Sequence, residues 1–582
     1  MPIVSIQNFA GMSPMKDASV LPDNAASYCS NAYLYGGVVR GFGATNPVHT
    51  LAGAGIRSVY RIPPSPSAPL DFIDSLWLEF QDPFMSVIRS PVIEDSYKRY
   101  YFFPSDQAPV NNGPYYNTLA NLEAGLPGYT IGLPDPAAAP SVSYAGGTST
   151  TTEVRSYVYT WVSEYNEEGP PSAPGVLSGT VDGTWTITVT APTTADVTQR
   201  ALTKTNIYRT VTDSTGVATY YLVETIPIAQ LAIVDAALDA SITSNQTLQS
   251  TTWTGPPSDL QGVVAMANGI LAGFSNSKEV WFCEPYLPHA WPSQYAVTVD
   301  APIVALAAVG TSLVILTENT PQIASGVAPS QMTLGKIASR EPCISRGSVV
   351  PAGEGVYYAS PNGLILVSTL GTTSVTQPII SKEYWNSLGP TAFAASKYAM
   401  AYVAFYMDSA ASDNGIIIDH VAMSVLISNL NAGQVVRNVY CDELSGSTFF
   451  ITNTEVYEWS PAAATTFDPY VWSSKEWRFP YAQPLVGGVV YFDVPPTLTI
   501  PTPTSATRNT SQTQTFNPET QYLLLKVYAD DRLVLVREIQ ETGELILFPS
   551  GFKATYWKFR FEGQVDIKEC KFATSVKELM TV

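Results

Sequence analysis

The chain has 582 residues, of which 14% are charged and 45% hydrophobic, and its formal net charge is −19 at pH 7. This length predicts several domains, and so high an apolar content excludes a disordered chain. A nucleic-acid-binding surface needs Lys and Arg to displace counterions from phosphate, so 49 acidic against 30 basic residues argue against one. The alternative explanation for the acidic excess is solubility.

Cysteine and histidine usage argues against metal and disulfide frameworks. The five cysteines are far apart and form no C-x-x-C pair: Cys29, Cys283, Cys343, Cys441 and Cys570. We therefore expect buried free thiols in a chain made in a reducing cytoplasm. The three histidines are too few for a metal cluster: His49, His289 and His420. No signal peptide and no apolar run of about 18 residues is visible, which predicts a soluble chain.

Residues 1–131 are predicted to form strands and proline-rich loops, as one N-terminal region. Around Trp77, apolar residues alternate with polar ones, which is the period of a half-buried strand. The phrase DSYKRYYFF follows and contains Asp95, Arg99 and Tyr101. Asp95 and Arg99 fit an ordinary surface ion pair, and they also fit a family phrase described below.

Residues 132–252 are predicted to form a fibronectin type III-like sandwich region, which begins with a Pro/Ala-rich linker at 132–144. Its strands alternate clearly, and Trp161 lies on one of them. Sandwiches of this class commonly bury an aromatic residue on a central strand, so we expect Trp161 in the core. Glu167 and Glu168 follow in an acidic turn, where solvated side chains are expected.

Residues 253–480 are predicted to form a β-propeller. Short runs rich in Val, Ile, Leu, Phe and Tyr occur at 263–266, 269–274, 279–283, 303–309, 312–317, 356–359 and 364–367. Turns such as Asn268-Gly269 and Gly310-Thr311 separate them. The phrases 263–285, 303–326 and 348–368 repeat one order of strand, turn, strand, turn and strand. This repetition favours propeller blades over a single sandwich.

Residues 481–582 are predicted to form a C-terminal β region. The segment 495–518 is rich in Pro, Thr and Ser and cannot bury enough apolar surface to fold alone, so it is predicted to be a loop or arm. Strands rich in Leu, Val, Tyr and Phe follow it. We therefore expect an all-β chain with four regions: a platform, a sandwich, a propeller and a C-terminal β region.

The order of several phrases resembles the tail nozzle proteins of short-tailed bacteriophages, the tail tubular protein B class. In the propeller these phrases are WFCEPYLPHAWP, SLVILTENTPQIASG, EPCISRGSVVPAGEGVYYASPNGLILVS and EYWNSL. In the first region, Trp77, Asp95, Arg99 and Tyr101 fit the family's platform phrase. Arg40 lies where family members often have Leu-Arg-Pro, but the proline is missing here.

Two later phrases extend the resemblance over most of the chain. Trp472, Ser474 and Lys475 match a family Trp-x-Ser-Lys phrase that leads the chain out of the propeller, although Lys475 also fits an exposed side chain without a role. Near the C-terminus, 548–551 resembles a Leu-Pro-x-Gly phrase in which Phe548 replaces Leu. Gly551 is predicted to adopt a positive φ in that turn.

The resemblance implies a structural virion protein located in the viral tail and made in the host cytoplasm. Family members form a homohexameric tube below a tail adaptor ring, close the tail before ejection and conduct the genome into the host. Tail fibres or spikes are possible further partners. Six copies carry six times −19, or −114, charges. Genomic DNA is therefore expected to pass through the lumen without specific binding.

No motif predicts catalysis. The P-loop, G-x-G-x-x-G, G-x-S-x-G, H-E-x-x-H and EF-hand patterns are absent. SGTVDGTW, which ends at Trp185, lacks the spacing of a sialidase Asp box. We therefore predict no enzyme activity, no catalytic, cofactor-binding or metal residues, and no cofactor. The alternative function is a phage tail propeller that binds or cleaves carbohydrate.

Overall fold

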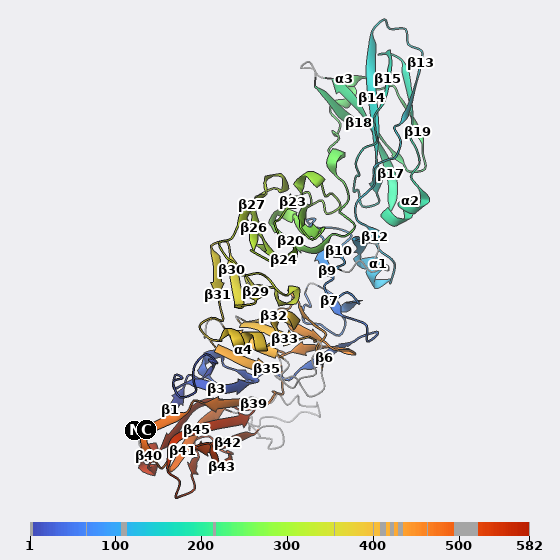
Figure 1. Cartoon of the computed structure of the whole chain (residues 1–582). Helices are drawn as coiled ribbons and strands as arrows, with labels where there is room; N and C mark the ends of the chain where they lie inside the picture. The colour runs from blue at the N-terminus through green and yellow to red at the C-terminus, as the bar shows by residue number, and fades with distance from the viewer. Residues whose placement is uncertain are drawn as a thin grey trace, which may run out of the picture. The chain divides into compact units, whose positions relative to one another are not determined.

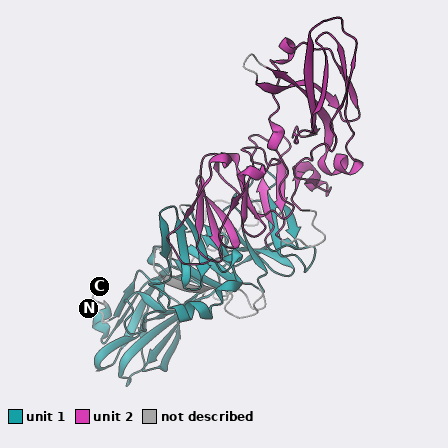
Figure 2. Ribbon diagram, turned by 45° about the horizontal axis from the view of Figure 1, so that its top comes forward, with its two compact units in different colours: residues 1–83, 343–582 teal, residues 84–342 magenta. Residues whose placement is uncertain are grey.

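The computed structural model describes residues 4–580 except 66, 106–112, 213–216, 354, 400, 408–414, 420–423, 429–434, 463 and 494–521. The predicted arm at 495–518 therefore lies outside the described residues. The chain forms two compact units (Figure 2). Unit 1 contains residues 1–83 and 343–582, and unit 2 contains residues 84–342.

The predicted fold class is confirmed, because strands make up 48% and helices 9% of the chain. The α-helices are short, and the longest described one, α2, spans Thr194–Arg200. In the part of the chain that the structure describes, no helix is long and apolar enough to cross a membrane. Short strands with frequent turns (Figure 1) thus form nearly all of the framework.

Unit 2 contains two four-stranded antiparallel sheets of the propeller-blade type. The first blade orders β20 (Gln261–Ala265), β21 (Leu271–Ser275), β22 (Glu279–Phe282) and β23 (Val297–Thr298). The second orders β24 (Ile303–Val309), β25 (Ser312–Thr317), β26 (Gln322–Ser325) and β27 (Thr333–Lys336). Gly310 takes φ +59° between β24 and β25, which a tight hairpin turn requires.

Unit 1 contains two further four-stranded blades. One orders β28 (Val350–Pro351), β29 (Gly355–Ser360), β30 (Gly363–Ser368) and β31 (Gly371–Ser374). The other orders β36 (Asn438–Cys441), β37 (Thr448–Ile451), β38 (Glu455–Trp459) and β6 (Asn46–Thr50). An N-terminal strand thus completes a blade whose other strands lie about four hundred residues later in the chain.

The remainder of unit 2 contains a seven-stranded sandwich. One sheet orders β13 (Ser141–Ala145), β16 (Thr184–Thr188) and β19 (Ala232–Asp235). The other orders β15 (Gly175–Thr180), β14 (Thr152–Ser163), β17 (Leu202–Thr212) and β18 (Ala218–Pro227). Trp161 on β14 is 5% exposed and packs in the core between the sheets, which confirms its predicted core position.

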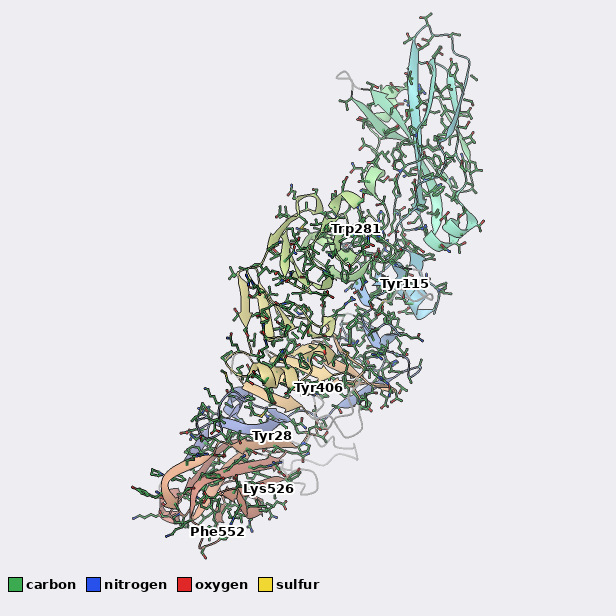
Figure 3. The ribbon with its side chains drawn as sticks, in the orientation of Figure 1. Tyr28, Tyr115, Trp281, Tyr406, Lys526 and Phe552 are labelled. Atoms are coloured by element: carbon green, nitrogen blue, oxygen red, sulfur yellow. The ribbon has the colours of Figure 1, made fainter. Side chains whose placement is uncertain are left out.

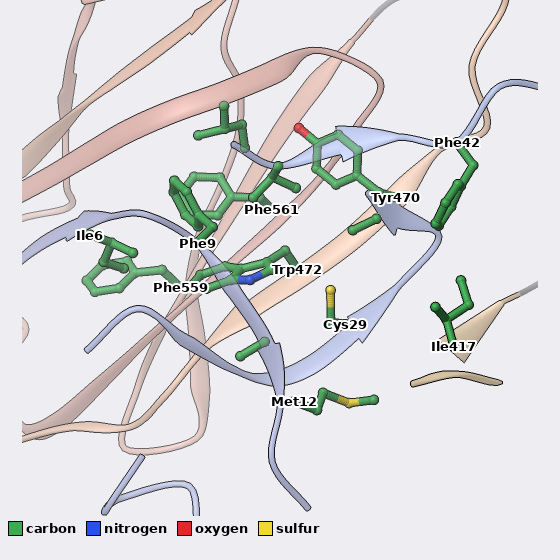
Figure 4. Close-up of a cluster of buried hydrophobic side chains, with 14 of the residues drawn as sticks. Ile6, Phe9, Met12, Cys29, Phe42, Ile417, Tyr470, Trp472, Phe559 and Phe561 are labelled. Carbon is green, nitrogen blue, oxygen red and sulfur yellow. The ribbon is translucent and has the colours of Figure 1, made fainter. Parts of the chain in front are cut away.

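The two ends of the chain meet in unit 1 (Figure 1). One sheet includes β2 (Ala10–Met12), β3 (Ala25–Ser30), β39 (Tyr470–Ser474), β45 (Ala554–Gly563), β42 (Leu523–Ala529) and β43 (Arg532–Glu538). A second sheet orders β1 (Val4–Gln7), β46 (Asp566–Ala573), β41 (Gly487–Asp493) and β44 (Leu545–Leu547). Phe9, Trp472 and Phe561 belong to the core that these strands share (Figure 4).

The units cut across two of the regions expected from the sequence. The expected N-terminal region, 1–131, is divided between unit 1 and unit 2 after residue 83. The expected propeller region, 253–480, is divided after residue 342. The sandwich strands, by contrast, all lie within the expected region 132–252.

Candidate functional site

A buried ionic cluster in unit 2 joins two segments that are far apart in the sequence. Its base is a small antiparallel sheet of β9 (Ser86–Arg89), β10 (Arg99–Phe103), β11 (Tyr115–Thr118) and β12 (Tyr129–Thr130). Arg99 Nε donates to Asp95 Oδ2 at 2.8 Å, and its Nη1 donates to Glu167 Oε1 at 2.6 Å. All three side chains are at most 6% exposed.

Tyrosine rings surround the Arg99 guanidinium and shield it from water. Its central carbon lies 5.7–6.0 Å from the ring centroids of Tyr97, Tyr101 and Tyr165. Tyr97 packs edge-on against Tyr165, with centroids 4.8 Å apart. Cation–π attraction adds to the ion pairs, and low local polarity strengthens both. The cluster therefore acts as a clamp between the turn before β10 and the acidic turn of the sandwich.

Burial shifts the pKa values of the acids and the histidine in this cluster. Burial opposes ionisation of Asp95, but hydrogen bonds from Arg99 and Ser90 outweigh it and lower the pKa of Asp95. Burial raises the pKa of Glu167 to about 7, although the charge of Arg99 opposes the rise. Burial, aided by the charge of Arg99, lowers the pKa of His289 to about 3. His289 Nδ1 lies 3.9 Å from Glu167 Oε1.

The cluster corrects two expectations from the sequence. Asp95 and Arg99 are not an ordinary surface pair, because both side chains are buried. Glu167 and Glu168 are not solvated either, since they are 4% and 7% exposed. Glu168 Oε1 accepts hydrogen bonds from Thr160, Asn206 and Tyr208 within the sandwich. Buried acids need such partners, so the acidic turn is a structural element of unit 2.

The Trp-x-Ser-Lys phrase holds the N-terminal segment within unit 1. The Trp472 ring meets Phe9 edge-on with centroids 4.9 Å apart, and its Nε1 donates to Ala10 O at 3.1 Å. Lys475 Nζ donates to Leu21 O at 3.2 Å and to Asp23 Oδ1 at 2.5 Å. Its side chain is only 15% exposed, so Lys475 is not a free surface lysine.

The other residues of the family phrases also have framework positions. Arg40 Nε donates to Asp566 Oδ2 at 2.9 Å, which ties the N-terminal segment to β46. Phe548 stacks on Trp557 with ring centroids 6.2 Å apart. Gly551 has φ +94°, which confirms its predicted conformation.

A second buried ion pair, between Arg61 and Asp442, was not predicted. Arg61 on β7 (Ser58–Ile62) is fully buried, and its Nε donates to Asp442 Oδ2 at 3.1 Å. The guanidinium also donates to Ser75 Oγ at 3.0 Å and to Pro69 O at 2.6 Å. The sequence does contain a signal for this pair, because Arg61 is a charged residue within the apolar strand SVYRI. A charged side chain that points into the core there needs a buried partner of opposite charge.

A pocket of about 860 Å³ lies in unit 2. It is lined by prolines, glycines and a few polar side chains, among them Tyr115 (Figure 3), Asp135, Gln199 and Arg200. Among the described residues of its lining, Asp135 is the one carboxylate, whereas glycoside cleavage uses two.

The described residues hold no group of three or more His, Cys, Asp or Glu side chains that could bind a metal ion. The five cysteines are free, and four of them are buried as expected. Cys441 is the exception, because it is exposed at the end of β36.

No family model matches the chain, and no curated protein matches it by sequence. Among solved structures, the chain is similar to the Pan2 WD40 domain of Neurospora crassa, with TM-score 0.26 and 7% identity over 49% of this chain and 85% of that one. BamB from Moraxella catarrhalis matches with a TM-score of 0.22 and 9% identity, over 65% of this chain and 97% of that one. A chain of the mitotic checkpoint complex matches with a TM-score of 0.25 and 10% identity, over 65% of this chain and 93% of that one. Scores this low carry no argument, so the fold assignment depends on the strands and sheets above.

Proposed function

We propose that this protein is a structural, non-enzymatic component of a phage virion. It is the tail nozzle, a homohexamer that forms the distal tube of a short tail, closes the tail before ejection and conducts the genome. Its neighbours are a tail adaptor ring and, in some tails, fibres or spikes. The protein is made in the host cytoplasm and resides in the viral tail.

The observation that carries this proposal is where the residues of the family phrases lie. Arg99, Trp472 and Lys475 each make framework contacts that join segments remote in sequence. Arg99, the one of the three that belongs to unit 2, does not line the pocket of that unit. Phrases shared for catalysis are expected to surround a substrate site, whereas phrases shared for architecture are expected to hold a framework together. The contacts support the second case.

Exposed apolar side chains support assembly into a larger particle. Ile73, Leu370 and Tyr481 are 90%, 98% and 79% exposed in the single chain. Scattered exposed apolar residues are normal, but side chains this large and this exposed gain most from a partner surface. The acidic excess suits a conduit, since a wall without basic patches does not retain duplex DNA at physiological salt. No described residue set favours the carbohydrate alternative.

Immunogold electron microscopy of the virion that carries this chain tests the proposal. An antibody against the chain should label the tip of the tail, and the tail there should have sixfold symmetry. Purified protein should release no oligosaccharide from host polysaccharide. Label on the capsid, no label on the virion, or enzymatic release of sugar would contradict the proposal.

A further inference from the structure

The sandwich of unit 2 is an insertion that two linkers connect to the rest of the unit. Residues 131–140 connect β12 to β13, and residues 236–260 connect β19 to β20. The linkers touch at two glycines, because a Cβ atom on Gly132 would lie 2.3 Å from Gly255 Cα. Gly132 also has φ +84°, a conformation that favours glycine. Both linkers therefore pass the same point, as the two strands of a hinge do.

The buried ionic cluster is a further attachment between the sandwich and the rest of unit 2. Glu167 is the sandwich's contribution to it. The titratable groups that face its carboxyl come from three other elements: Asp95 from the turn before β10, Arg99 and Tyr101 from β10, Tyr116 from β11, and His289 from the loop between β22 and β23. Separating the sandwich from the sheet would therefore separate Glu167 from all of these groups.

The charges of the cluster do not balance when both carboxyl groups are ionised. Arg99 supplies one positive charge to Asp95 and Glu167, at 2.8 and 2.6 Å. His289 adds none near neutral pH, because burial lowers its pKa to about 3. Two negative charges and one positive charge leave a net charge of −1 in a site that excludes water, which is unfavourable. One proton on a carboxyl group removes the imbalance.

The contacts place this proton on Glu167 rather than on Asp95. Asp95 accepts a backbone hydrogen bond from Tyr97 at 3.1 Å in addition to that from Arg99 Nε, and its lowered pKa keeps it ionised. Glu167 Oε2 and the Tyr116 hydroxyl beside it have no partner of hydrogen-bond geometry among the described residues. Desolvation without such partners disfavours the carboxylate form of Glu167.

We propose that the cluster is a proton-controlled joint, which holds the sandwich against the rest of unit 2 while Glu167 keeps its proton and opens when Glu167 releases the proton to water. Opening hydrates the new carboxylate and leaves Arg99 paired with Asp95. The linkers at Gly132 and Gly255 keep the sandwich attached. Because the pKa of Glu167 is raised in the closed state, the closed state is favoured most below pH 4.5 and loses this advantage as the pH rises through about 7.

The pocket of about 860 Å³ lies beside this joint and gives the sandwich room to move. Gln199 and Arg200 of the sandwich helix α2 line it, and so do Tyr115 and Thr130 of the sheet. The packing between the sandwich and the sheet is interrupted there, so the ionic cluster contributes a large share of the attachment.

Hydrogen exchange of the full-length chain at about pH 5, 6 and 7.5 tests the joint, with each rate divided by that of an unstructured peptide at the same pH. The joint amides are those of residues 95–99, 164–169 and 284–291, and the amides of β14 and β17 report on the sandwich itself. Protection of the joint amides should fall by about tenfold or more over this range, since one released proton allows up to about tenfold per pH unit. The joint amides should also be less protected than those of β14 and β17.

Two neutral variants and a matched control identify the group that titrates. Glu167→Gln cannot ionise and should keep the joint amides protected at each pH, and Glu167→Met should do the same. Glu164→Gln removes an exposed acid of the same turn and should keep the wild-type response. Circular dichroism checks that each variant is folded.

The results decide between a joint and a rigid contact. Protection that falls with pH in the wild type and in Glu164→Gln, but not in the two Glu167 variants, supports the joint. Protection that does not change with pH, or that changes equally in the Glu167 variants, overturns it. Joint amides as well protected as those of β14 and β17 would show that the contact opens only when unit 2 unfolds, which also overturns the joint.

Discussion

Replacing Arg99 by methionine should destabilise unit 2 more than any surface substitution. Methionine keeps the length of the side chain but removes the charge that Asp95 and Glu167 share at 2.8 and 2.6 Å. The two buried carboxyl groups, 6% and 5% exposed, then lack the cation that they share. Removing one partner of a buried pair typically costs about 3–5 kcal/mol, because the remaining charge stays desolvated.

This cost predicts a measurable shift in the unfolding temperature of unit 2. For domains of about 150–250 residues, 1 kcal/mol corresponds to roughly 2–4 °C, so the expected shift is about 6–20 °C. Scanning calorimetry of the full chain measures it. Hydrogen exchange should show that the loss of stability is located at residues 95–103 and 164–169, where the amides should exchange faster. Arg89→Met, on the exposed end of the neighbouring strand β9, is the matched control and should shift the transition little.

A double variant isolates the electrostatic part of the effect. Arg99→Met together with Glu167→Gln replaces one of the two unpaired carboxyl groups by a neutral amide, so it should recover part of the loss. A shift for Arg99→Met no larger than that of Arg89→Met would refute the reasoning. Equal losses in the single and double variants would show that lost packing, rather than an unpaired charge, is responsible.

Three further predictions concern single residues of the framework. Folding raises the pKa of Glu167 from 4.5 to about 7. Its contribution to the free energy of unfolding is therefore fully present below the unfolded-state pKa of 4.5 and is lost as the pH rises through 7. The stability of the wild type should therefore fall relative to Glu167→Gln over this window, and parallel profiles in calorimetry would contradict it. Trp472→Ala should cost about 3–5 kcal/mol in denaturant unfolding, and a loss below about 1 kcal/mol would contradict its burial. Lys475→Met should cost at most about 1 kcal/mol, yet hydrogen exchange should rise at 21–24; unchanged exchange there would show that the lysine does not hold this loop.

Local strand signals were readable from the sequence. The runs predicted at 303–309 and 312–317 coincide with β24 and β25. Both runs consist mainly of Val, Ile, Leu and Ala, and Gly310 marks the turn between them. Both signals act within a few residues, so they need no tertiary information.

Pairings between remote segments were not readable. β6 joins β38, and β1 joins β46, across most of the chain length. Edge pairing depends on which backbone groups remain free after local sheets form, and sequence periodicity does not record this. Buried charges were missed for a related reason. Arg99 and Glu167 have the composition of surface residues, and only their contact removes them from solvent.

The symmetry of the assembled protein in the virion tests the central claim most directly. Electron microscopy of isolated tails, with this chain located in the density, counts the copies in the distal tube. The proposal predicts six copies in one ring, a mass of six times 62.8 kDa, or about 377 kDa. It also predicts a channel wall without a net positive surface. A dimer or trimer at that position, or a channel lined mainly by Lys and Arg, would contradict the account.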